Sequence, residues 1–286
     1  MLSRIVAVLF FACVASSRVN AAEPSPACVA IGRAQAKELY PGLRHEAPPN
    51  GTPNIPDPDS PDYLIRCKPV PEDASKMILL LPRKQMGAAN EANGCCIADI
   101  LVLNVNDRRV LSRTEIQLLP MQTAVDEGGS DWYHVTDLSI DTAAYRLAPS
   151  VRAFGIRAVY QPASPHQYFD LIGTLDLYVM DGMSIRRELG SLVTSRHSGT
   201  PSFEDDTCPP EEHSLLRVIS IAPANSQGYA DLSVGETFDK TGGVTDNGAC
   251  LKAETHQKRR LVLHHDGNEY VISKDLHVLN EVKTPR

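Results

Sequence analysis

The sequence predicts an all-β protein, mainly antiparallel and sandwich-like, with one short N-terminal helix. Beyond residue 62, apolar and polar residues alternate over short segments, which is the period of strands that bury one face. Clusters of Gly, Pro, Asn and Asp separate these segments, and Asp-Gly pairs stand between alternating runs, as in tight hairpins. The alternative is a partial β-propeller, because the hairpin-like segments 101–111, 175–185 and 261–272 resemble one another.

The first 22 residues have the layout of a secretory signal peptide. A short basic start precedes an apolar run over residues 5–14, and small residues end at Ala22. The run is too short to span a bilayer. We therefore expect an exported protein, periplasmic or secreted. Cys13 lies inside the leader and leaves a lipid anchor open as an alternative.

The segment 26–40 has the spacing of a helix. Pro26 suits a first helical turn, apolar and long side chains recur every four residues, and Pro41-Gly42 ends the pattern. Residues 41–62 hold too many prolines for a helix or an interior strand and are expected to form a loop. We expect strands over the segments 77–81, 97–105, 135–140, 151–160, 215–221 and 230–237. The expected organisation is a leader over 1–22, a helix and Pro-rich loop over 23–62, and a β-rich domain over 63–286, which two packed sheets could form.

Cysteines indicate the compartment as well. All but Cys13 of the seven lie outside the leader, and an even count in an exported chain predicts disulfides. The simplest pairing is Cys28 with Cys67 and Cys208 with Cys250, each closing a loop of roughly 40 residues. Cys95 and Cys96 are adjacent. Either they form a strained ring, or one faces the core and the other pairs elsewhere.

The charge of the chain limits its partners. The net charge is −7 at pH 7, which disfavours binding to nucleic acid and favours a basic envelope or secreted protein as partner. No second apolar run is long enough for a transmembrane helix.

Motifs for catalysis are missing from the sequence: we find no nucleophile elbow, zinc-protease motif, phosphate loop or Cys-x-x-Cys pair. We predict no catalytic, cofactor-binding or metal-binding residue. The nine histidines are scattered, and we expect solvated surface side chains.

The candidate binding surface has two parts. Trp132 and Tyr133 follow a Gly-rich loop and could form an exposed anchor, although a core position is the commoner role of such a Trp. The second part is an acidic stretch near Cys208, which could steer a basic partner or be a solvated loop. Its members are Asp205, Asp206, Glu211 and Glu212.

Residues 140–157 resemble a recurring segment in a family of uncharacterised exported proteins of Gram-negative bacteria. The hairpin at 177–182, the run 228–232, the Tyr40-Pro41 helix end and the Cys67-Lys68 strand are similar to that family as well. The resemblance implies export and this fold, and it transfers no site. Within the first segment, Tyr145-Arg146 is expected to end a strand at a turn. Arg152 and Arg157 should lie on opposite faces, where one pairs with Asp137 or Asp141 or both bind an anion.

Two classes of function follow from these observations. The first is an exported non-catalytic protein that binds a protein or envelope ligand, such as an inhibitor, immunity protein or adaptor. The alternative is a cell-envelope hydrolase with paired carboxylates, which would require two residues among Asp141, Asp176, Asp205 and Asp206 to lie close together in a cleft. A purely structural envelope component is a third, weaker interpretation.

Overall fold

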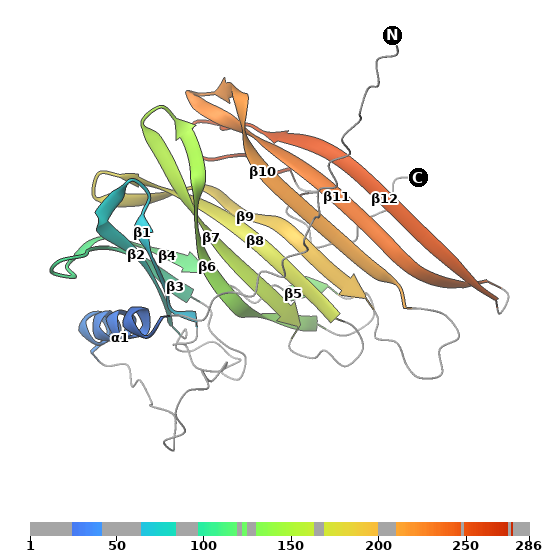
Figure 1. The fold of residues 1–286 in the computed structure, drawn as a ribbon, viewed down its shortest axis with the longest axis horizontal. Coiled ribbons are helices and arrows are strands. Elements are labelled where there is room, and N and C mark those ends of the chain that lie inside the picture. Colours follow the sequence, from blue (N-terminus) through green and yellow to red (C-terminus); the bar gives the residue numbers. More distant parts are fainter. Residues whose placement is uncertain are drawn as a thin grey trace, which may run out of the picture.

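The computed structural model describes residues 25–41, 64–83, 97–118, 122–124, 130–162, 169–199, 210–246 and 249–273, together with Leu276. Within these residues the chain forms two antiparallel sheets and the short helix α1 (Pro26–Leu39) (Figure 1). This confirms the predicted all-β class with one helix; the two sheets pack face to face and are not arranged as propeller blades.

The smaller sheet is a meander of four strands in the order β1-β2-β3-β4. Each strand pairs with the next one in sequence, and turns at Glu72 and Arg108 use positive φ. The bounds are β1 (Arg66–Val70), β2 (Asp73–Arg83), β3 (Ile97–Asn104) and β4 (Val110–Gln117).

The larger sheet has eight strands in the order β12-β11-β10-β9-β8-β7-β6-β5, so each strand again pairs with its neighbour in sequence. Several strands are long, and β6 alone has 19 residues. The bounds are β5 (Gln122–Ala124), β6 (Ser130–Ala148), β7 (Val151–Pro162), β8 (Phe169–Asp181), β9 (Ser184–Gly199), β10 (Glu212–Ser226), β11 (Tyr229–Asp246) and β12 (Ala249–Leu263).

A first apolar core lies between the two sheets. Alternate residues of β2 and β3, such as Ile78 and Ile100, pack against Phe154, Ile156 and Tyr178 of the larger sheet. All are nearly inaccessible to solvent. The packing follows from the two-residue period of the strands, since every second side chain points to the partner sheet.

A second core forms where the larger sheet crosses over itself. β9 and β10 pair only over the segments 195–199 and 212–216. Beyond these residues the strands part, and β10 and β11 contact β6. The side chains between them come from β6, β7, β8, β9, β11, β12 and the segment after β12. They include Leu147, Ala153, Leu175, Leu177, Leu189, Leu232, Val234, Leu263, Tyr270, Ile272 and Leu276.

Helix α1 covers the outer face of the smaller sheet. Cys28 and Ala36 pack against Leu79 and Leu101, in a third apolar cluster. Gly32 allows the close approach of the helix, because a Cβ there would lie 2.8 Å from a methyl carbon of Ile65.

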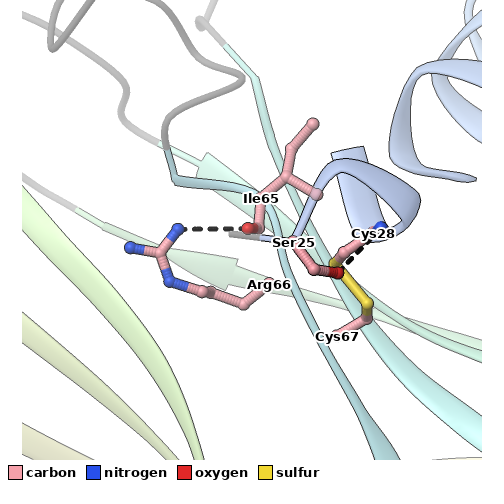
Figure 2. Close-up of a disulfide and its surroundings, with 5 residues drawn as sticks. All are labelled: Ser25, Cys28, Ile65, Arg66 and Cys67. Carbon is pink, nitrogen blue, oxygen red and sulfur yellow. Dashed lines mark hydrogen bonds between the residues drawn. A yellow bond between two sulfur atoms is a disulfide. The ribbon is translucent and has the colours of Figure 1, made fainter. Parts of the chain in front are cut away.

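A disulfide and a cap fix the start of the helix (Figure 2). The side chain of Ser25 accepts a hydrogen bond from the N–H of Cys28, as an N-cap does. Cys28 is bonded to Cys67 of β1, which confirms the predicted pairing. Figure 2 shows Arg66 on the opposite side of β1 from Cys67, and its guanidinium reaches Asp137 of β6 at 2.9 Å. Neighbouring residues of β1 thus hold the helix on one face and the larger sheet on the other.

Strand positions agree with the sequence pattern, with two exceptions. The segments expected as strands lie in β2, β3, β6, β7, β10 and β11, and the hairpins at Asp107 and Asp181-Gly182 form. The third expected hairpin is reduced to an isolated bridge between His265 and Tyr270. Tyr145-Arg146 does not end a strand: β6 continues to Ala148, with a shift of register after Asp141.

Several expectations fall outside the described residues. These are the leader with Cys13, the Pro-rich loop after position 41, the Cys95-Cys96 pair and Cys208. Cys250 lies on β12, opposite Thr245 of β11, but its side chain is not described.

Loss of the disulfide should weaken the fold without removing its elements. The double substitution Cys28→Ser/Cys67→Ser releases a loop of 39 residues, and we expect it to lower the free energy of unfolding by about 2–4 kcal/mol. Urea titration of the variant and of the oxidised wild type would measure this. Equal midpoints and slopes would contradict a stabilising role of the bond.

Candidate functional site

Of the six residues predicted to form a binding surface, the structure describes the side chains of two, Glu211 and Glu212. Trp132 and Tyr133 lie in the first part of β6, paired with Gln122 and Pro162, and their side chains are outside the described residues. Asp205 and Asp206 lie outside them as well. Glu211 and Glu212 are described, and they differ in their contacts and exposure.

Glu211 is already engaged by a neighbouring histidine and a neighbouring lysine. Its two carboxylate oxygens lie 2.6 Å from Nε2 of His213 and 2.7 Å from Nζ of Lys240. The hydrogen bond with Lys240 and that with His213 hold the pKa of Glu211 below its ordinary value. Glu212 is the exposed first residue of β10, where it pairs with Gly199 and Thr241. This part of the acidic stretch is therefore partly neutralised within the protein.

The carboxylates Asp141 and Asp176 cannot act as a catalytic pair. Asp141 lies opposite Gly155, and Asp176 lies opposite Ile156, the next residue of β7. Neighbouring positions of a strand point to opposite faces. Asp141 is therefore on the face of the second core and Asp176 on the face of the first.

Arg152 and Arg157 are both paired, and they lie on opposite faces as expected. Arg157 contacts Asp141 at 2.7 Å, and Arg152 contacts Glu72 of the smaller sheet at 2.7 Å. Burial disfavours the charged form of Asp141, but hydrogen bonds from Ala143 and Tyr145 and the charge of Arg157 outweigh it and lower its pKa. The predicted ion pair with Asp141 is confirmed, and the two guanidiniums are engaged by carboxylates of the protein.

Asp176 is a buried acid inside the first core. Its side chain is 4% exposed, and it accepts a hydrogen bond from the N–H of Ser191, which has a positive φ of 50° at an irregularity of β9. Burial raises the pKa of Asp176 to about 6, against the opposing effects of that hydrogen bond and of Arg187. The carboxyl group thus supports a strand irregularity, at the cost of burying an acid.

Asp176 should make the fold less stable as the pH rises. Its pKa is about 6 in the folded protein and 3.8 as an ordinary value, so the unfolded chain loses its proton first. As the pH rises from 3.8 to about 6, the free energy of unfolding therefore falls by about 3 kcal/mol in total. Asp176→Asn keeps an acceptor for Ser191 and removes the charge. We expect this variant to gain stability over the wild type between about pH 4 and about pH 7.

Denaturant titrations of the oxidised proteins at several pH values would measure this difference. Asp73→Asn is the control, since Asp73 is partly exposed and its pKa is lowered by Ser75 and Lys76. If the free energies of unfolding of wild type and Asp176→Asn changed with pH in the same way, the raised pKa of Asp176 would be contradicted.

Glu188 and His265 form a buried pair that the sequence analysis missed. Both side chains are fully inaccessible, with Nε2 of His265 2.9 Å from the carboxylate. Arg186 lies 2.7 Å from the other carboxylate oxygen. The ring of His265 stacks on Tyr229 at 4.1 Å between centroids and meets the edge of Tyr270. The expectation of solvated histidines is therefore wrong for His265.

The hydrogen bonds around His265 indicate which ring nitrogen is the donor. Nδ1 accepts a hydrogen bond from the N–H of Gly267, at 3.0 Å. Nε2 is therefore the N–H group of the ring, and it donates a hydrogen bond to Glu188. Burial raises the pKa of Glu188, while His265 and Arg186 oppose that shift. The pair joins β9 to the segment after β12, because the N–H of Tyr270 also bonds to the carbonyl of Glu188.

A nearby group of Ser226, Asp231 and His264 lacks the geometry of a catalytic triad. The serine hydroxyl donates to Asp231 at 2.7 Å, and the same nitrogen of His264, Nδ1, faces both Ser226 and Asp231. A triad needs one ring nitrogen for the acid and the other for the nucleophile. The group instead links the turn after β10 to the end of β12.

Removal of Glu188 should be costly, because it leaves Arg186 and His265 without their buried partner. We expect Glu188→Ala to lower the free energy of unfolding by about 3–5 kcal/mol. The control is Glu269→Ala, which removes a half-exposed contact with Arg187 at 3.6 Å and should cost under about 1 kcal/mol. Chemical denaturation compares the two. Equal losses would contradict the special role of the buried pair.

The surface with the clearest features of a binding site is the outer face of β10, β11 and β12. Register pairs arrange it in three rows: Leu216, Thr237 and Lys258; Val218, Gly235 and Arg260; Ser220, Ser233 and Val262. We call these nine residues the outer face. The alternate residues of the same strands, among them Leu215, Val234 and Leu263, point inward and are buried.

The outer face is apolar and cationic. Leu216, Val218 and Val262 are 53%, 62% and 46% exposed. Lys258 and Arg260 are exposed, and neither lies within 4 Å of a carboxylate among the residues that the structure describes. No Asp or Glu stands in the three rows. Exposed apolar side chains gathered on one face are typical of interaction surfaces.

A buried ion network supports the outer face from beneath. Arg217 donates to Glu236 at 2.8 Å and to the carbonyl of Val193, and Arg259 contacts the same glutamate. Burial disfavours the charge on Glu236, but the two guanidiniums outweigh it and lower its pKa. The strands that carry the outer face are therefore tied together and to β9.

Among the described residues, no group of three or more His, Cys, Asp or Glu side chains is arranged to hold a metal ion. The same residues include no helix with the length and apolar character needed to cross a bilayer.

Comparison of the chain with protein-family models, curated proteins and solved structures found no match.

Proposed function

We propose that the chain is an exported, non-catalytic binding protein that contacts its partner through the outer face of β10–β12. The observation that carries this proposal is the outer face itself, where three exposed apolar side chains share one sheet surface with two cations that have no described carboxylate within 4 Å. An inhibitor, an immunity protein or an adaptor would use such a surface. Residence in the periplasm or outside the cell belongs to this proposal.

Rigidity supports a binding role. The outer face lies on paired strands with buried inner sides, and the network of Arg217, Glu236 and Arg259 fixes them. A surface that is already ordered loses little conformational entropy when a partner binds. Exposed Leu and Val side chains then contribute the burial of apolar area.

Export is supported by the leader layout and by the disulfide. The bond between Cys28 and Cys67 would persist in an oxidising compartment. The resemblance to exported Gram-negative proteins is a further argument for the same compartment, and membership of that family is part of the proposal. A basic partner, which the total charge favours, is not what the cations of the outer face would select.

The hydrolase alternative receives no support from the described carboxylates. Asp141 is paired with Arg157, and Asp176 is buried on the other face of the sheet. Each charged cluster described above joins elements of the fold through groups of the protein. A binding role explains why apolar side chains are exposed on the outer face. Catalysis by Asp141 or Asp176 would not explain it.

The proposal predicts that two substitutions on β10 abolish capture of the partner. Oxidised wild-type protein and Leu216→Asp/Val218→Asp would serve as baits in envelope extracts, with captured proteins identified by mass spectrometry. Loss of exposed apolar contacts and repulsion by the new carboxylates should remove the specific partner. Thermal melting of both baits would show that the variant is folded.

Met183→Asp/Val105→Asp is the matched control. These side chains are 80% and 46% exposed and lie in the turns after β8 and β3. The control should retain the partner. Capture that is equal for all three baits, or turnover of cell-wall fragments by the wild type, would overturn the proposal.

A further inference from the structure

Strand β12 is an edge strand with one unpaired side. It has 15 residues, ends the order of the larger sheet, and pairs with β11 along its whole length (Figure 1). Within the described ranges no strand lies on its other side. A long exposed edge offers N–H and C=O groups to an added strand, and proteins usually protect such edges.

The edge carries positive charge at three consecutive positions. Lys258 and Arg260 point to the outer face, and Arg259 points to the inner side, where it contacts Glu236. On that inner side Glu236 faces two guanidiniums, those of Arg217 and Arg259. On the outer face, Lys258 and Arg260 therefore place two cations side by side along the edge, in a chain whose net charge is −7.

We propose that the edge of β12 binds an acidic, extended segment of the partner protein as an additional strand. This inference rests on the proposed function and names the chemistry of its partner. Backbone hydrogen bonds to a free edge give affinity, and alternate side chains give selectivity. Residues of the added strand opposite Lys258 and Arg260 would be Asp or Glu, and the residue opposite Val262 would be apolar.

The cations select among possible strands. A basic strand would place like charges opposite one another, which is unfavourable across neighbouring strands. A second copy of β12 would bring the same cluster of cations, with Glu254 as its one acidic residue between 254 and 260. An acidic segment is the occupant whose charge complements this edge.

A synthetic peptide tests the inference directly. It carries Glu at two alternate positions, Val at the next alternate position and Thr elsewhere, and its binding to the oxidised full chain is followed by fluorescence anisotropy. We expect saturable binding that weakens at high salt. Peptides with Lys in place of Glu, or with alternate backbone amides N-methylated, should bind at least about tenfold more weakly.

A charge-reversed pair provides the matched control. Lys258→Glu/Arg260→Glu should weaken binding of the Glu peptide by about tenfold or more. Arg108→Glu/Arg109→Glu changes the net charge equally in the turn between β3 and β4, remote from β12, and should leave binding unchanged. Melting curves would show that both variants fold.

Three results would overturn the inference. These are no binding of the Glu peptide, equal binding of the N-methylated peptide, and self-association through the edge that sedimentation detects and Lys258→Glu/Arg260→Glu abolishes. If the β10 variant loses its partner in the capture experiment while the Glu peptide fails to bind, then the proposed function stands and the edge inference is wrong.

Discussion

The central strands of the larger sheet must bury both of their faces, and the rest of the structure is arranged to cover them. In β8 a run of eight residues is buried without alternation. One face carries Ile172 and Tyr178 and is covered by the smaller sheet. The other carries Leu175, Leu177 and Val179 and is covered because β10 and β11 swing across to β6. A strand of this composition would aggregate if either cover were absent.

This constraint explains where the ion pairs are found. Arg66 with Asp137 and Arg152 with Glu72 connect the smaller sheet to the larger one. Arg217, Glu236 and Glu188 lie at the crossing of β9 with β10–β12. Apolar packing determines which faces contact each other. The charged groups then fix the relative position of these faces, because each group is costly to bury without its partner. The outer face of β10–β12 can remain exposed because other elements already cover both faces of the central strands.

Much of the fold follows from local pattern. The two-residue period placed the strands, Pro26 and Pro41-Gly42 bounded the helix, and Asp181-Gly182 set a hairpin. The pairing of Cys28 with Cys67 was the simplest one, because the two cysteines are 39 positions apart and close a short loop. In each case the determining residues are close in sequence or are covalently joined. Their effect does not depend on the rest of the chain.

Other features depend on contacts that no local pattern contains. Glu188 and His265 are 77 residues apart, and a lone His in a strand-like run gives no sign of its partner. The crossing of β10 over β6 depends on where β9 and β10 separate, which neither strand indicates alone. Two signals were present in the sequence: Asp176 interrupts an apolar run, and Lys258, Arg259 and Arg260 are three consecutive cations next to an apolar end of strand.

The chain completes its second core with the last described residues. Leu263, Tyr270, Ile272 and Leu276 close the space between β6–β9 and β11. Tyr270, Ile272 and Leu276 follow β12 in the chain, so a nascent chain that has not yet reached them lacks part of the cover on this side of the central sheet. Apolar side chains of the second core stay partly accessible until this segment is added, and removal of the segment would expose them again.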